Sequence, residues 1–209
     1  MTTKGAVFFF LLKPFIRKDI IRCVRACFMK GIVFREFIDM VEASFGDEMV
    51  DTIISSCDLE SGGAYSAVGT YDHTELVQMV VALSGQTGVE VPTLVEAFGT
   101  YLFGRFLDLF PVFFNHSTSF EFLNSIHDVV HVEVLKLYPD AGLPSFNSSI
   151  SDDKKTLHFE YHSSRHFADL AVGLMKGAFA HWNEEVDIAI EDRTSGDEQV
   201  VMFTCTLNE

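Results

Sequence analysis

Tyr161, Ser163 and Arg165 form a Tyr-x-Ser-x-Arg group of hydrogen-bond donors where a predicted strand turns into a helix. Side chains alternate along a strand, so Tyr161 and Ser163 are expected on the same face. The guanidinium fork of Arg165 has the geometry that binds a carboxylate through two hydrogen bonds. The three donors would suit any anion. A polar turn is also typical of a helix N-cap, and that interpretation, with Ser163 or Ser164 as the cap, stays open.

A second group of candidate side chains lies on a predicted helix that carries His127 and His131 beside an apolar seam. A helical histidine near an apolar stripe is most often a hydrogen-bonded core residue. Because His127 precedes His131 by one turn, the pair also suits a metal clamp. A zinc site would need further ligands, and Asp128 and Glu133 point to other faces. Taken with the Tyr-x-Ser-x-Arg donors, His131 suggests a ligand with both a metal and carboxylates, which describes haem.

Composition limits the classes of protein and of partner. A chain of 209 residues forms one domain, with or without a tail, and has a substantial core. Its 21 Phe cluster at 8–10, 103–114 and 120–122, where they line a large apolar cavity or simply fill the core. The net charge of −15 and the pI near 4.8 argue against nucleic acid and against an anionic membrane surface as partners.

The four cysteines are scattered, at positions 23, 27, 57 and 205, with no Cys-x-x-Cys pair and no zinc-site spacing. Free thiols in a reducing cytosol are therefore expected. The sequence also has no Cys-x-x-Cys-His motif, so any haem is expected to be held without a covalent bond. No apolar run reaches the length of a transmembrane helix.

Residues 1–28 differ from the rest of the chain. They hold six Lys or Arg against one acid, a net charge of +5, so the remainder carries −20. An apolar run at 6–12 follows a single Lys, as in a signal peptide, but charged residues come next and no small-residue cleavage site comes promptly. We interpret 1–28 as an appended or mis-assigned basic leader, not native or poorly ordered, with a basic amphipathic helix at 15–28 if translated. The domain is then 29–209.

The elements that position these residues can be predicted from periodicity and helix breakers. The predicted helices are 29–45, 47–56, 72–83, 92–110, 119–138 and 165–182; a Gly/Ser-rich loop covers 58–71. The predicted strands are 145–150 and 156–162, then a hairpin of 186–191 and 200–207. The fold class is α+β: a helical N-terminal subdomain packed on a C-terminal subdomain with a small antiparallel sheet and a long helix that carries His131.

Five sequence blocks resemble the H-NOX family, the haem nitric oxide/oxygen binding domains of the standalone bacterial type. In the family's order and spacing, the blocks are 29–34, 97–103, 126–138, Leu143-Pro144 and Tyr161-x-Ser163-x-Arg165. Together they cover about residues 29–207.

The resemblance implies a role for each matching residue. His131 matches the axial ligand of the haem iron, and His127 does not. Tyr161, Ser163 and Arg165 match the clamp on the haem propionates, and Pro144 matches the proline that distorts the porphyrin. On looser local alignment, the residues that match the distal pocket are Val33, Phe37, Phe106, Leu170 and Leu174.

One position separates NO-binding from O₂-binding members. The latter carry a distal tyrosine five residues after the clamp arginine, where this chain has Leu170. Bound O₂ gains from a hydrogen-bond donor, and Fe–NO needs far less help, so the resemblance implies a preference for NO. Tyr101 is a candidate for another hydroxyl in the pocket. Some relatives also carry a C-terminal Cys/His zinc cluster; this tail holds only Cys205, so no structural zinc is expected.

The resulting hypothesis is a cytoplasmic NO sensor without enzymatic activity, holding non-covalent haem b. NO binding at ferrous haem would weaken the bond between iron and His131. Because the chain ends at Glu209 without an effector region, the signal is expected to pass to a separate histidine kinase or diguanylate cyclase/phosphodiesterase. The alternatives are an O₂ or redox haem sensor, and a metal-dependent enzyme that uses His127, His131 and nearby carboxylates.

Overall fold

The computed structural model describes residues 28–208, and the predicted leader at 1–28 lies outside it except for Phe28. The helices are α2 (Gly31–Phe45), α3 (Asp47–Ser56), α4 (His73–Thr87), α5 (Val91–Leu109), η1 (Pro111–Phe114), α6 (Ser119–Ser125), η2 (Ile126–Val130), α7 (His131–Leu137) and α8 (Ala168–His181). The strands are β1 (Phe28–Lys30), β2 (Thr70–Asp72), β3 (Ser145–Ile150), β4 (Thr156–Ser163), β5 (Val186–Asp192) and β6 (Gln199–Leu207). The predicted α+β class is confirmed.

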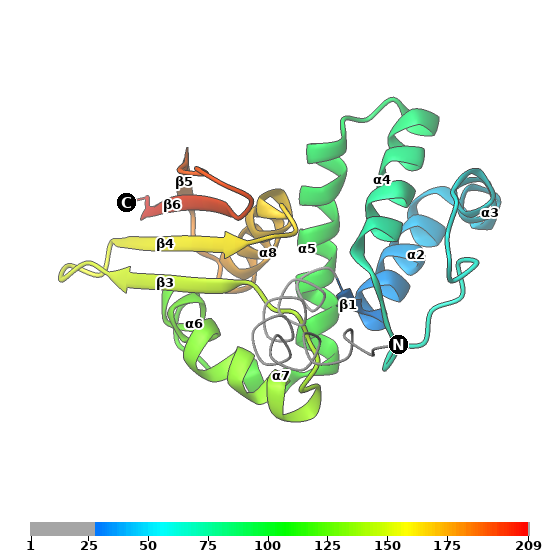
Figure 1. The fold of residues 1–209 in the computed structure, drawn as a ribbon. Coiled ribbons are helices and arrows are strands. Elements are labelled where there is room, and N and C mark those ends of the chain that lie inside the picture. The colour runs from blue at the N-terminus through cyan, green and yellow to red at the C-terminus, as the bar shows by residue number, and fades with distance from the viewer. Residues whose placement is uncertain (1–27, 209) are drawn as a thin grey trace, which may run out of the picture.

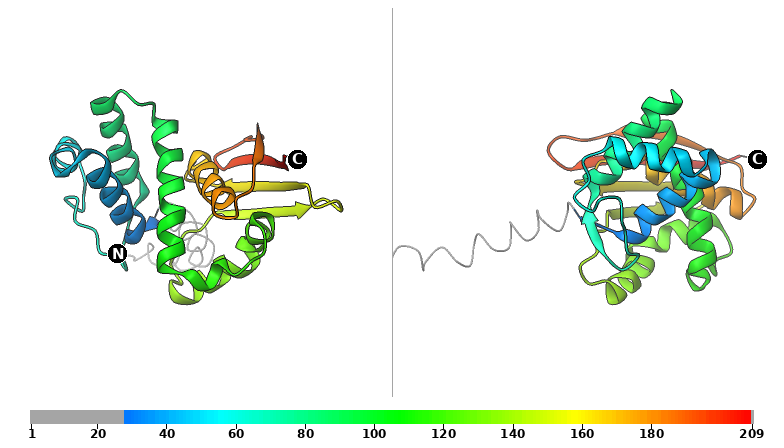
Figure 2. Two further views of the ribbon diagram at one scale, coloured as in Figure 1. Left: turned by 180° about the vertical axis from the view of Figure 1, so that it is seen from behind. Right: turned by 90° about the vertical axis from the view of Figure 1, so that its right-hand side faces the viewer.

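The elements form two halves with α5 between them (Figure 1). Helices α2, α3 and α4 lie on one side of α5, and α8 followed by the sheet lies on the other. The reverse view shows the same order (Figure 2). The segment from α6 to α7 begins next to β3 of the sheet and continues below α5 (Figure 1). The helical N-terminal half and the sheet-containing C-terminal half therefore agree with the prediction.

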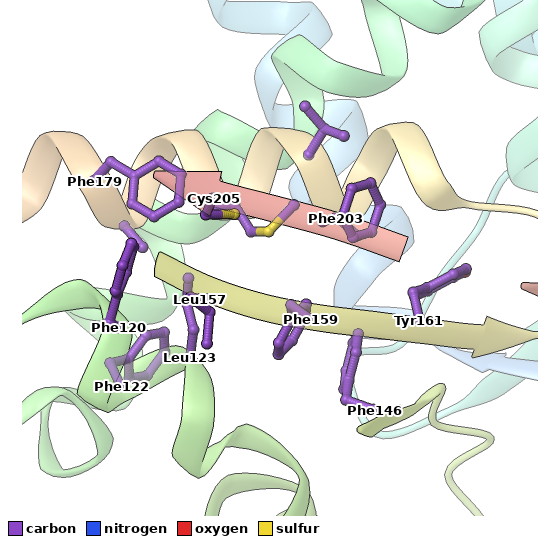
Figure 3. Packing of buried hydrophobic residues seen from close by; sticks show 14 of the residues in the cluster. Phe120, Phe122, Leu123, Phe146, Leu157, Phe159, Tyr161, Phe179, Phe203 and Cys205 are labelled. Carbon is purple, nitrogen blue, oxygen red and sulfur yellow. The ribbon is translucent and has the colours of Figure 1, made fainter. Parts of the chain in front are cut away.

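The larger sheet is antiparallel with the strand order β3-β4-β6-β5. Alternate residues of β4 are buried, from Leu157 through Phe159 and Tyr161 to Ser163, because one face of the sheet packs on the core. Side chains from α6, β3, β4, β6 and α8 meet there in one apolar layer (Figure 3). This layer places the end of β4, and with it the Tyr-x-Ser-x-Arg turn, against the α5–α8 pair.

Two glycines allow α5 and α8 to pack closely. A Cβ on Gly99 would lie 2.4 Å from the carbonyl oxygen of Leu170 and 2.9 Å from the Cα of Gly173. A Cβ on Gly173 would lie 2.0 Å from the carbonyl oxygen of Glu96. The two backbones therefore touch, and the hydroxyl of Thr100 donates to the carbonyl of Gly173 across 3.1 Å. This crossing sets the spacing between the two halves.

Three predicted helix bounds were wrong, each for a local reason. The first helix begins at Gly31, because Phe28–Lys30 pair with β2 instead. The third helix does not stop before Gly85 but continues to Thr87 and ends at Gly88, whose φ of 72° is the left-handed conformation of a helix end. The last helix begins at Ala168, because His166 has a φ of 57°, outside the right-handed helical region.

The predicted helix 119–138 follows a helical path, but it is not one regular α-helix. Residues Ile126–Val130 form a π-helical turn between α6 and α7. Such a turn inserts extra backbone and rotates every later side chain relative to the earlier ones. The predicted loop 58–71 likewise contains the start of β2, a short strand whose partner β1 lies far away in the sequence.

Among residues 28–208, no helix is long and apolar enough to cross a membrane.

Candidate functional site

A cavity of about 300 Å³ lies where the two halves meet. Its walls come from β1, α2, α5, η1, the α6–η2–α7 segment, the loop at 141–144, the β3–β4 pair and α8. Nearly all of the lining is apolar, and eight phenylalanines contribute: Phe103, Phe106, Phe110, Phe113, Phe114, Phe122, Phe146 and Phe159. The polar or charged side chains in the lining are Lys30, His131, Tyr138 and Arg165. A cavity of this size and polarity is typical of a small-molecule or cofactor site.

His131 lies in the cavity wall at the first position of α7. Its ring lies 5.5 Å from the ring of Phe146, centroid to centroid. Burial lowers the pKa of His131 to about 4, and electrostatic interactions with His127 and Arg165 act in the same direction. A hydrogen bond with the Pro144 carbonyl opposes this shift. The imidazole is therefore neutral at pH 7, which is the form that ligates a metal.

His127 lies one turn earlier but outside the cavity. Its side chain is exposed, and its Nδ1 accepts a hydrogen bond of 3.4 Å from the backbone N–H of Phe146. Both histidines also line a second hollow, between the η2–α7 segment and the loop at 141–145, but only His131 of the two reaches the apolar cavity. The two rings therefore have different surroundings.

The Tyr-x-Ser-x-Arg residues divide into two groups. Tyr161 and Ser163 are buried on the same face of β4, as predicted. The Tyr161 hydroxyl accepts a 3.2 Å hydrogen bond from the N–H of Phe167, and the Ser163 hydroxyl accepts one of the same length from the N–H of Arg165. Burial raises the pKa of Tyr161. Arg165, by contrast, lies in the cavity wall.

The alternative that this turn merely caps a helix is wrong. The N-cap position of α8 is Phe167, with no side-chain cap, so neither Ser163 nor Ser164 caps the helix. The two hydroxyls instead hold the backbone that presents Arg165. The guanidinium donates a 3.4 Å hydrogen bond to the Phe28 carbonyl and so also contacts β1.

Four of the five predicted distal residues line the cavity: Val33, Phe106, Leu170 and Leu174. The fifth, Phe37, does not; it is fully buried behind the wall, with its ring 5.2 Å from that of Phe98 in an edge-to-face contact. Tyr101 also lies outside the lining, while Pro144 is part of it.

Sequence reasoning missed an ion pair that joins the two helices of the distal wall. The Nε of Arg105 on α5 lies 2.7 Å from a carboxylate oxygen of Glu36 on α2, and the Glu36 side chain is buried. Val33 precedes Glu36 by one turn and Phe106 follows Arg105 directly, so the pair fixes the spacing of two lining residues. A separation of 69 residues left no local pattern that would have revealed it.

Lys30 and Tyr138 were missed as well. The Lys30 Nζ lies 5.2 Å from the centroid of the Tyr138 ring, and both side chains line the cavity. Nothing in their spacing along the chain indicates this contact, because they come from segments far apart in the sequence. The one local signal was the position of Lys30 within a short apolar run, where a charged side chain needs a partner.

The residues present fit a haem group. A neutral imidazole in the wall of an apolar cavity suits iron, and a guanidinium in the same wall suits propionate carboxylates. The fold and the cavity therefore define a domain built to enclose a planar cofactor between a helical half and a sheet-containing half.

The comparisons with known proteins give the family. The Haem-NO-binding family profile matches residues 30–190. A crystal structure of the Fe(II) unliganded H-NOX protein from K. algicida is 38% identical, with a TM-score of 0.80, and the match covers 87% of this chain and 97% of that one. The H-NOX protein from S. oneidensis in the Fe(II)NO state is 26% identical, with a TM-score of 0.78 and coverage of 87% and 100%. No protein with a curated description matched.

The chain belongs to the Haem-NO-binding family, that is, to the H-NOX domains. Domains of this family are haem-based gas sensors. The resemblance identified from the five sequence blocks is thereby confirmed.

Proposed function

We propose that the protein is a nitric oxide sensor that binds haem b without a covalent bond, with His131 as the axial ligand. The observation that carries the proposal is the placement of a neutral His131 in the wall of an apolar cavity. Arg165, in the same wall, binds the propionates, and Tyr161 and Ser163 hold the turn that presents it. Pro144, in the loop after α7, lines the cavity and would press on the porphyrin.

Haem would supply, when bound, a ferrous iron that binds NO, and His131 would hold that iron through its imidazole. The residues of the chain would transmit the binding of NO. A weaker link between His131 and the cofactor would free α7 to shift, and Pro144 would move with the adjoining loop. The apolar distal wall formed by Val33, Leu170 and Leu174 excludes water and offers no hydroxyl to bound O₂. NO needs no such donor, so this wall favours NO over O₂.

We propose further that the protein acts in the cytoplasm, has no enzymatic activity, and passes its signal to a separate protein. The resemblance to standalone members supports a histidine kinase or a diguanylate cyclase/phosphodiesterase as that partner. A change in the sensor affects the partner only if the partner binds the two states with different affinity.

Anaerobic absorbance spectra of the reduced, haem-loaded protein test the proposal. We expect a Soret shift when NO is added, and no lasting oxy-complex when the reduced protein is exposed to air. Absence of a response to NO would overturn the sensor function. A stable oxy-complex in air would instead favour an O₂ sensor.

A further inference from the structure

The segment that carries His131 is anchored to the sheet at its N-terminal part. Ile126 and Val130 of η2 pack against the apolar cluster of the sheet, α6 and α8. That cluster includes no residue of α7, whose inner side lines the cavity through His131 and Leu137. Contacts at the C-terminal end of α7 therefore help to position His131.

A polar cluster joins the C-terminal end of that segment to the N-terminal half. The Lys30 Nζ on β1 lies 2.9 Å from Asp140 Oδ2, in the loop just after α7, and 2.8 Å from Thr70 Oγ1 on β2. The Thr70 hydroxyl donates to the same Asp140 oxygen across 2.8 Å. The three groups thus form a closed triangle across 110 residues of sequence. We call it the Lys30 tie.

The environment of the tie makes Lys30 its central member. The Lys30 side chain is only 12% exposed, whereas that of Asp140 is 52% exposed. A largely buried ammonium left without an anion is costly, so Lys30 favours positions of the loop that keep Asp140 within reach. Tyr138, the residue just after α7, adds its ring face to the ammonium. Both ends of the turn from 138 to 140 are therefore drawn toward Lys30.

We propose that Lys30 is a positioning residue for His131: through Asp140 and Tyr138 it holds the C-terminal end of α7, and with it the Pro144 loop, against β1 and β2. This inference rests on the proposed function, because a shift of α7 on gas binding has meaning only in a gas sensor. The tie then opposes that shift. The Lys30 tie therefore determines how readily His131 leaves its position. It also determines how strongly a shift of α7 is passed to the N-terminal half.

Two variants and a matched control test the proposal in the reduced, haem-loaded protein. Lys30→Met removes the ammonium and keeps most of the aliphatic chain, and Asp140→Asn removes the charge of its partner with little change in shape. Lys136→Met is the control, because Lys136 pairs with Glu133 inside the same helix and does not reach the N-terminal half. If Lys30→Met does not fold, Asp140→Asn decides.

The first readout is hydrogen exchange of the amides at 131–143 without NO. We expect about tenfold faster exchange in Lys30→Met and in Asp140→Asn, no change in Lys136→Met, and a double variant no faster than Lys30→Met, because both changes break one contact. The second readout is the stopped-flow rate of the Soret change after mixing with NO, which should rise several-fold in the same two variants.

Three results would overturn the proposal. The first is wild-type exchange and wild-type NO kinetics in both variants. The second is an equal effect of Lys136→Met, which would show only a general loosening of α7. The third is loss of haem in Lys30→Met with no change in Asp140→Asn, which would mean that Lys30 acts on the cofactor directly. If the Soret band of the wild-type protein does not change when NO is added, the proposed function is wrong. The exchange rates without NO still show whether the Lys30 tie holds α7.

Discussion

At the scale of single residues, burial separates side chains that look equivalent in the sequence. His127 and His131 lie one turn apart, yet one is exposed and the other faces an apolar cavity. Desolvation keeps the His131 ring neutral by lowering its pKa, and a neutral ring has a free lone pair for a metal. Tyr161, Ser163 and Arg165 all bond to backbone, but of the three only Arg165 also lies in the cavity wall.

The first prediction concerns the axial ligand. His131→Gly should remove the imidazole from the cavity, change the Soret band of the reduced haem protein, and abolish the effect of NO on α7. Added imidazole should fill the space left by the side chain and restore the spectrum. His127→Gly is the matched control, because that ring lies outside the cavity. A wild-type spectrum in His131→Gly would contradict the assignment.

The second prediction concerns the cationic group of the cavity. Arg165→Ala should leave the fold intact and speed haem loss by about 10- to 150-fold, since a hydrogen bond to a charged group contributes about 1.5–3 kcal/mol. Transfer of haem to a haem-scavenging protein measures the rate, and circular dichroism checks the fold. Arg193→Ala is the control, because Arg193 is an exposed residue just after β5 that pairs with Glu191. Equal rates in the two variants would show that Arg165 only supports β1.

At the scale of elements, the site depends on where two pairs of helices are held together. Glu36 and Arg105 join α2 to α5, and the glycine crossing joins α5 to α8. Backbone atoms of Leu170, Gly173 and Leu174 lie next to Gly99 at this crossing. The distance between α5 and α8 therefore determines where the side chains of Leu170 and Leu174 stand in the cavity wall. The π-helical turn of η2 has a comparable effect on the opposite wall, because it sets the direction in which His131 points.

The third prediction tests the crossing. Gly99→Ala should lower the free energy of unfolding by about 1–3 kcal/mol, because the new methyl group meets backbone atoms that cannot move aside. Gly104→Ala, in the same helix with open space at its Cβ, should raise it by about 0.5–1 kcal/mol. Urea unfolding of the two variants gives the comparison. Similar values for both would show that α5 and α8 separate at little cost.

At the scale of the whole molecule, two apolar clusters form the two halves, and the cavity lies between them. One cluster joins the sheet to α6 and α8, and the other joins the four helices α2, α3, α4 and α5. Leu174 packs against both clusters and also lines the cavity. A group bound in this space touches both halves, so its position and their relative placement are coupled.

The fourth prediction is a pH dependence of global stability. Burial raises the pKa of the Cys205 thiol to about 12, whereas in the unfolded chain it ionises near pH 9. Above pH 9 the unfolded state therefore loses a proton that the folded state keeps, and the free energy of unfolding falls as the pH rises. Between pH 8 and pH 10 this amounts to about 1.4 kcal/mol. Urea unfolding of wild type and Cys205→Ala at both pH values measures it; equal slopes would contradict it.

Much of the fold was predictable because its elements are short-range features. Helices 47–56 and 92–110 and the strands at 145–150 and 186–191 can be predicted from periodicity, capping residues and prolines, and their observed bounds agree within one residue. The errors fall where backbone conformation departs from those rules. His166 with positive φ and the π turn of η2 are set by tertiary packing and leave little trace in local sequence.

The sequence by itself determined the family, the helical and sheet halves, and the identity of His131 and Arg165 as candidates, because these depend on residue types at set spacings along the chain. Only the tertiary structure decided that His131 faces the cavity while His127 does not, that Phe37 lies behind the wall, and that Lys30 meets Asp140. Each of those facts joins segments far apart in the chain. Burial and charge pairing arise only once those segments pack together.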